Sequence, residues 1–126
     1  MTWSYVCVLL AGFMPLLFTG YAKFTGPGFN NRRPRDFLAG LDGARQRANA
    51  AQQNSFEAFP LFAASVLMAN QAGVDSSTID MLAIAYVPLR LAYGVLYVMD
   101  KASLRSLVWL LATLIWITLM VMAALA

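Results

Sequence analysis

Residues 104–126 read LRSLVWLLATLIWITLMVMAALA, and this stretch decides the class of fold. It contains no charged residue from position 106 to its end. A helix needs about 20 apolar residues, each rising about 1.5 Å, to cross the roughly 30 Å hydrocarbon core of a bilayer. Because lipid offers backbone polar groups no hydrogen-bond partner, the stretch is expected to be a transmembrane α-helix.

Three further apolar spans precede this one, at about 3–24, 48–72 and 79–99. Four spans predict an all-α integral membrane protein: a single domain over 1–126 folded as a four-transmembrane-helix up-down bundle. Pro15, Pro60 and Pro88 lie inside spans and are expected to kink them locally. Lys23 follows the first span, and no positive charge precedes it, so we interpret this span as a retained helix and not as a signal peptide.

The composition agrees with a membrane domain. Sixty per cent of the residues are hydrophobic, only 12% are charged, and the mean hydropathy is +0.64, whereas a soluble domain carries about 25% charged residues. The single cysteine, Cys7, excludes an intrachain disulfide and is expected to be a small buried hydrophobe. With one cysteine and no histidine, neither a structural zinc site nor a Ser-His-Asp triad can be built, and no metal site is expected.

The basic residues predict an orientation. Six of the nine lie between positions 23 and 47, around the first connection, and Lys101 and Arg105 flank the third connection. The second connection has none. By the positive-inside rule, the first and third connections are cytoplasmic, and both termini lie on the opposite side of a multi-pass protein. Because the basic residues follow this topology, no nucleic-acid partner is expected.

The first connection, about 25–45, is the one long polar loop. It contains GPGFNNRRPR at 26–35, which is rich in turn-forming residues. Its arginines are explained either by topology together with contact to anionic membrane lipid headgroups, or by an anion-binding rim for a substrate that carries carboxylates. The sequence leaves both interpretations open.

Polar residues open the second span. They include Arg47, Gln53, Asn54 and Glu57, the last three within AQQNSFEAFP at 51–60. Asn54 and Glu57 are three residues apart and therefore share a helix face. Glu57 is expected roughly 10 Å inside the span. A carboxylate at that depth is costly unless it is paired, protonated or facing a wet cavity.

The third span carries a stripe of polar and aromatic residues with helical spacing: Tyr86, Arg90, Tyr93 and Tyr97. Arg90 is expected roughly 13 Å from the cytoplasmic end of its helix. Glu57 and Arg90 would then lie at similar depth on consecutive antiparallel helices, so we expect them to pair. The pair either fixes helix register only or forms part of a polar pocket that opens to the cytoplasmic side.

The fourth span begins with Leu104, Arg105 and Ser106 on that same side. Free N–H groups and the helix dipole favour an anion at such a terminus. Arg105 adds a positive charge and Ser106 a hydroxyl donor, a combination that can lower the pKa of a thiol and hold its thiolate. The alternative is that Arg105 only extends its charge to the membrane interface.

Taken together, these residues resemble the MAPEG family, the membrane-associated proteins in eicosanoid and glutathione metabolism. The resemblance is carried by RANAAQQNSFEAFPLFAASVLMA at 47–69, in which Asn54, Glu57 and Pro60 fit the family pattern, and by RLAYGVLY at 90–97 and LRS at 104–106. It covers essentially the whole chain. Ala50 and Ala58 depart from eicosanoid members, as does Tyr93 where the prostaglandin-forming type has histidine.

The resemblance implies a homotrimer that binds glutathione as cosubstrate between subunits, and a transferase, peroxidase or isomerase activity on a lipophilic small molecule. Asn54 and Glu57 would hold the polar ends of glutathione, and Lys23 would meet a carboxylate from the adjacent subunit. Arg105 would stabilise the thiolate with Ser106 beside it. The pocket lining would include Arg90, Tyr93 and Tyr97, and Arg47 would partly substitute for the arginine missing at position 50.

Two other functions remain open at this stage. The first is a non-catalytic binding or scaffold protein of the same fold. The second is a small four-helix transporter, although such proteins usually place a carboxylate in their first helix, and the first span here has no acidic residue.

Overall fold

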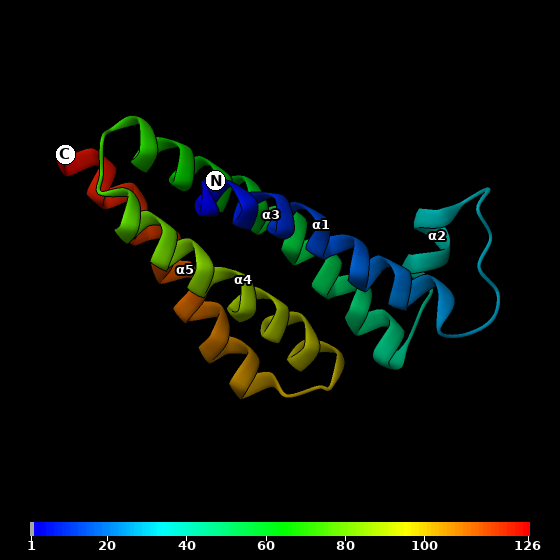
Figure 1. The fold of residues 1–126 in the computed structure, drawn as a ribbon. Coiled ribbons are helices and arrows are strands. Elements are labelled where there is room, and N and C mark those ends of the chain that lie inside the picture. Colours follow the sequence, from blue (N-terminus) through cyan, green and yellow to red (C-terminus); the bar gives the residue numbers. More distant parts are fainter. Residues whose placement is uncertain (1) are drawn as a thin grey trace.

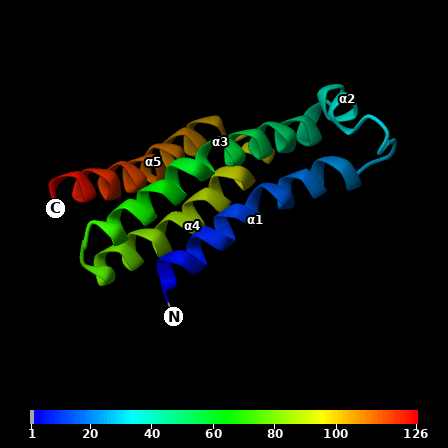
Figure 2. The ribbon, with the colours of Figure 1, turned by 90° about the horizontal axis from the view of Figure 1, so that it is seen from above.

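A computed structural model describes residues 2–126, and every regular element among them is a helix (Figure 1). Four helices are long: α1 (Trp3–Phe24), α3 (Gly43–Gln71), α4 (Ser76–Val98) and α5 (Ala102–Leu125). The short α2 (Pro34–Ala39) lies within the first connection. The long helices alternate in direction, so both termini lie at the end of the bundle opposite α2 (Figures 1 and 2).

The helices α3 and α4 form the centre of the bundle. They pack against each other; α1 packs against both of them, and α5 also packs against both. The helices α1 and α5 therefore lie on opposite sides of the central pair (Figure 2). As a consequence, polar side chains that face inward from α3 and α4 meet residues of α5 on one side and of α1 on the other.

The predicted spans correspond to the four long helices, with two corrections. The helix α3 begins at Gly43, five residues before the predicted start at about 48. The prediction was wrong here because the first turns of α3 are polar and resemble the adjoining loop. Arg45 and Arg47 in these turns donate to backbone carbonyls of α1 and α4, which anchors them. The second correction is α2, which begins at Pro34, a residue favoured at the first position of a helix, and interrupts the predicted loop.

Three helices, α1, α4 and α5, are long and apolar enough to cross a membrane. The helix α3 is the longest, at 29 residues, but its first half carries arginine, glutamine, asparagine and glutamate side chains that lower its hydropathy. The polar half lies at the end of the bundle that also holds α2 (Figure 1). The residues that weaken α3 as a membrane span thus include the candidate site residues of this helix.

The core is built from small residues and a stacked aromatic pair. Buried alanines bring the helices close together, as is usual between membrane helices. Phe62 of α3 and Tyr86 of α4 stack with ring centroids 3.8 Å apart. Tyr86 therefore belongs to the core, whereas the other residues of the predicted polar stripe on α4 lie nearer the end of the bundle that holds α2. Cys7 is buried, as expected.

Large apolar side chains cover the outside of the bundle. On α5 only Ala112 and Leu119 are buried, while its other leucines and Trp109 are exposed. One face of α1 also exposes large apolar side chains, from Trp3 at its start to Phe24 at its end. Apolar surface of this extent is not found on soluble monomers and indicates contact with lipid or another protein.

At the end of the bundle that carries the termini, Asp80 links α4 to α1. Its carboxylate accepts a hydrogen bond of 2.9 Å from the backbone N–H of the buried Ser4 in the first turn of α1.

We expect Asp80→Ala to reduce the free energy of unfolding by about 1 kcal/mol, because it leaves the N-terminus of α1 uncapped. Thermal unfolding in detergent measures the effect. Asp80→Asn keeps an acceptor and should lose less, and Asp42→Ala, an exposed residue without a side-chain cap bond, is the control. An equal loss in the control would contradict the role of Asp80.

Candidate functional site

Arg90 is the most unusual residue of the bundle. Its side chain is only 3% exposed, and it lies on α4 about 12 Å from the helix end at Val98. Its Nη2 donates to Oδ1 of Asn54 on α3 at 2.7 Å. Within residues 2–126 the one ion pair joins Arg33 and Asp36, so Arg90 is a buried cation held by a neutral amide. Such a cation in a membrane helix indicates a functional site.

The predicted pair of Glu57 and Arg90 is wrong. Glu57 is exposed and makes no ion pair with Arg90 among the described residues. Three residues rotate a helix by about 300°, so Glu57 lies about 60° around α3 from Asn54. This rotation turns Asn54 toward α4 and Glu57 toward the outer side of α3.

A stack of two aromatic rings between two cations leads outward from Arg90. The guanidinium of Arg90 lies 4.3 Å from the ring centroid of Tyr93, and the rings of Tyr93 and Tyr97 meet edge to face at 5.8 Å. The guanidinium of Arg105 on α5 lies 4.3 Å from the ring of Tyr97. Cation–aromatic contacts of this kind orient both partners without neutralising the charge. Both arginines thus keep their charge, and Arg105 lines a cavity.

A cavity of about 230 Å³ opens beside this stack. It is lined by Tyr93, Tyr97, Arg105, Ser106 and Trp109. Arg105 and Ser106 lie in the first turns of α5, whose first N–H groups receive no side-chain cap. An arginine and a hydroxyl near the start of α5 thus line one small cavity, which is therefore suited to an anion such as a thiolate or carboxylate.

A second cavity of about 190 Å³ lies along the same side of α3 and α5. Asn54, Glu57 and Trp109 are among its lining residues. Trp109 also lines the first cavity, so the two cavities lie on either side of this residue. The first cavity is lined by a cation, Arg105, and the second by a carboxylate, Glu57.

The remaining candidates lie outside this cluster. Arg47 donates from Nε to the carbonyl oxygen of Val98 at 3.1 Å and ties the start of α3 to the end of α4. Gln53 is exposed and lines a larger cavity, of about 520 Å³, together with Glu57 and Arg35 of α2. Lys23 lies at the end of α1 with Nζ 4.9 Å from the ring centroid of Phe29. The structure thus groups Asn54, Arg90, Tyr93, Tyr97, Arg105 and Ser106, with Glu57 at the margin.

The sequence analysis missed the contribution of α5 beyond its first turns. Trp109, Thr113 and Trp116 line the second cavity. They follow Arg105 by four, eight and eleven residues, which is helical spacing. This periodicity was present in the sequence, but it was hidden because tryptophan and threonine are ordinary residues of a membrane span.

These features define an all-helical membrane bundle with a buried cationic site. The profile of the MAPEG family matches residues 1–125. The chain therefore belongs to the MAPEG family, whose members include glutathione-dependent transferases and peroxidases. No curated protein and no solved structure gave a significant match.

Proposed function

We propose that this protein is a glutathione-dependent membrane enzyme of the transferase or peroxidase type. Arg90 supports the proposal most strongly: it is a buried arginine without a carboxylate partner among the described residues, held by Asn54 and in contact with Tyr93, which lines the cavity beside Arg105. A protein that needed only a structural contact would pair such a charge, because an unpaired one is costly in a membrane. The family supplies the ligand class.

Glutathione has two carboxylates, one ammonium and a thiol, and the site offers complementary groups. In this proposal Arg90 binds a carboxylate, and Glu57 with Asn54 holds the ammonium end. Arg105 and Ser106 hold the sulfur at the start of α5. A cation beside the thiol lowers the pKa of that thiol, so more of it is the nucleophilic thiolate near neutral pH.

The thiolate then attacks a lipophilic substrate that arrives laterally from the bilayer. With a carbon electrophile, a carbon–sulfur bond forms and the leaving group departs. With a lipid hydroperoxide, the thiolate attacks the terminal oxygen, the O–O bond breaks, and the alkoxide takes a proton from water to give the alcohol and glutathione sulfenic acid. The thiol of a second glutathione then displaces the sulfenic oxygen as water, which leaves glutathione disulfide. In both cases the role of Arg105 is to stabilise the thiolate before attack.

The proposal includes the assembly and orientation of the protein. All four long helices cross the membrane, α3 with its polar half at the cytoplasmic end, and both termini lie on the opposite side. Three subunits cover part of the exposed apolar surface of α5 and α1. Lys23, Arg47 and Gln53 lie near the cytoplasmic end of the proposed site, with Lys23 reaching glutathione from the adjacent subunit.

A single-atom change at Asn54 tests the binding mode. Asn54→Asp supplies Arg90 with the carboxylate that it lacks, at a donor–acceptor distance that is now 2.7 Å. We expect glutathione affinity to fall by about tenfold or more, because the ligand must compete with an internal ion pair. Calorimetric titration measures the affinity, and thermal unfolding should show that the variant is at least as stable as the wild type.

The control for this variant is Asn70→Asp, at the opposite end of the bundle, where Asn70 donates to Ser4 and not to Arg90. Unchanged glutathione affinity in Asn54→Asp would contradict the site. Activity is tested with purified protein on a chlorodinitrobenzene-type electrophile and on a lipid hydroperoxide. Glutathione binding with no turnover of either would favour a non-catalytic protein. Proton-coupled efflux from vesicles that Glu57→Gln abolishes would favour a transporter.

A further inference from the structure

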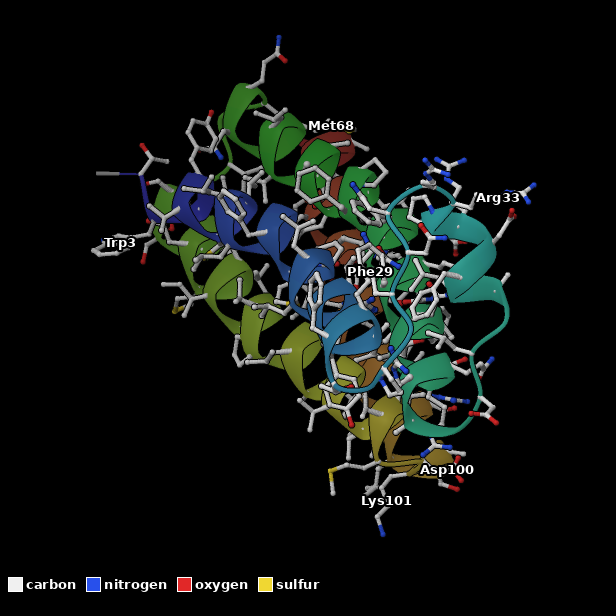
Figure 3. The ribbon with its side chains drawn as sticks, turned by 90° about the vertical axis from the view of Figure 1, so that its right-hand side faces the viewer. Trp3, Phe29, Arg33, Met68, Asp100 and Lys101 are labelled. Atoms are coloured by element: carbon white, nitrogen blue, oxygen red, sulfur yellow. The ribbon has the colours of Figure 1, made fainter. Side chains whose placement is uncertain are left out.

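The first connection is folded against the end of the bundle. We call residues 25–42 the loop platform; it includes α2. Figure 3 looks onto this end, with Phe29 over the bundle and Arg33 at its outer edge. Residues 23–47 contain six basic and two acidic residues, whereas the rest of the chain has three basic and four acidic residues. The positive charge of the protein is therefore concentrated here.

Arg45 at the start of α3 fixes the loop platform to α1. Its guanidinium donates to the carbonyl oxygens of Ala22 at 2.9 Å, Lys23 at 3.1 Å, Gly26 at 3.4 Å and Pro27 at 3.1 Å. A Cβ on Gly26 would lie 2.7 Å from Nη1 of Arg45, so any other residue at position 26 would require the guanidinium to shift. Arg45 thus donates to carbonyl oxygens at the C-terminal end of α1 that would otherwise lack a hydrogen-bond donor. Its role is therefore structural.

An aromatic layer lies between the platform and the helix ends. Phe24, Phe29 and Phe37 meet edge to face, with ring centroids 5.3 and 5.5 Å apart. Lys23 lies over Phe29, and Arg45 lies over Phe37. Phe24, the last residue of α1, is 70% exposed. Aromatic rings next to basic residues are typical of the boundary between hydrocarbon and headgroups.

The arginines of the platform divide into two groups. Arg35 lines the cavity that contains Glu57. Arg32 and Arg33 are exposed, and Arg33 contacts only the exposed Asp36, through an ion pair of 3.0 Å whose partners are 79% and 69% exposed. Since exposed ion pairs contribute little, Arg33 is free to exchange Asp36 for another anion.

We propose that Arg32 and Arg33 bind the headgroups of anionic phospholipids, and that the loop platform is a preformed selector for such lipids. The aromatic layer fixes the depth of the platform at the membrane boundary, and Arg45 holds the fold before any lipid arrives. The guanidinium groups then meet the phosphate at headgroup level, where each basic residue adds to the affinity for an anionic surface. The selectivity is independent of glutathione, because neither arginine lines the cavities of the proposed site.

Native mass spectrometry of the full chain tests this proposal. The protein is released from micelles that contain equal amounts of phosphatidylglycerol and phosphatidylcholine with identical acyl chains. We expect the wild type to retain phosphatidylglycerol preferentially. Replacing arginine by glutamine should reduce the ratio of retained lipids by roughly fivefold for each residue, so Arg32→Gln/Arg33→Gln should nearly abolish the preference. Asp36→Asn should raise the ratio, because it releases Arg33.

Lys101→Gln, which removes an exposed cation from the α4–α5 turn, is the matched control and should change the ratio less than Arg32→Gln does. An equal effect of the two single variants would overturn the proposal, since the net charge of the protein and not the loop platform would then determine the ratio of retained lipids. Equal retention of the two lipids by the wild type would also overturn it. Millimolar inorganic phosphate should leave the ratio unchanged, and displacement by phosphate would show a free-anion site instead.

Discussion

Arg105→Ala is expected to remove most of the bound glutathione thiolate at neutral pH. In the proposed site the guanidinium of Arg105 is the cation nearest to the sulfur, and it is positioned by its contact with Tyr97 at 4.3 Å. A nearby cation stabilises the charged form of the thiol and lowers the pKa of the thiol. Without Arg105 the pKa of the thiol should rise by one unit or more, which reduces the thiolate fraction by about tenfold below that pKa. Turnover should fall in proportion.

The ultraviolet absorbance of the thiolate, followed as a function of pH in the glutathione complex, measures this change. Arg105→Lys keeps the charge and should retain part of the shift. The control is Lys101→Ala, which removes a cation from the residue that precedes α5 and makes no side-chain cap bond. If the thiolate titrates at the same pH in Arg105→Ala and in the wild type, the role assigned to Arg105 is wrong.

Gly94→Ala is expected to give the largest loss of stability. Phe18 of α1, which is only 6% exposed, packs directly over Gly94 of α4, and a methyl group at position 94 would overlap its ring. Because Phe18 lies in a buried cluster with Met14 and Ala51, its ring can move only by displacing these neighbours. We expect a cost of about 1–3 kcal/mol from overpacking, seen as a lower unfolding temperature in detergent.

Gly20→Ala on α1 is the matched control. It is also a glycine within a helix, but a Cβ there would have nothing within 4 Å. This variant should be neutral or slightly stabilising, since alanine restricts the unfolded chain. Phe18→Leu combined with Gly94→Ala should recover part of the lost stability. Equal stability of the two alanine variants would show that the contact between α1 and α4 does not depend on Gly94.

The four long helices could be predicted from the sequence because apolar length alone identifies most of them. The start of α3 could not, since its polar first turns are held by Arg45 and Arg47 through backbone carbonyls that are distant in sequence. Hydropathy contains no signal for such contacts. From the sequence, Arg45 could therefore be interpreted only as one of the charges that set the membrane orientation. In the fold it also donates to the carbonyl oxygens that end α1.

The grouping of the site was predictable where residues share one helix face, and not where partners come from two helices. Helical spacing placed Arg90, Tyr93 and Tyr97 on one stripe, and the structure shows these three adjacent. The partner of Arg90 was assigned by depth alone, which does not distinguish Asn54 from Glu57. The rotation of α3 about its axis decides between them, and that rotation is set by packing of the whole bundle.

The central claim is that the buried cations around Arg90 and Arg105 bind glutathione and stabilise its thiolate. A titration of the purified wild-type protein with glutathione across pH tests this claim most directly, because thiolate absorbance reports both occupancy and ionisation. We predict saturable binding with the pKa of the bound thiol well below that of free glutathione. Absence of saturation, or a bound thiol that titrates as free glutathione does, would contradict the account.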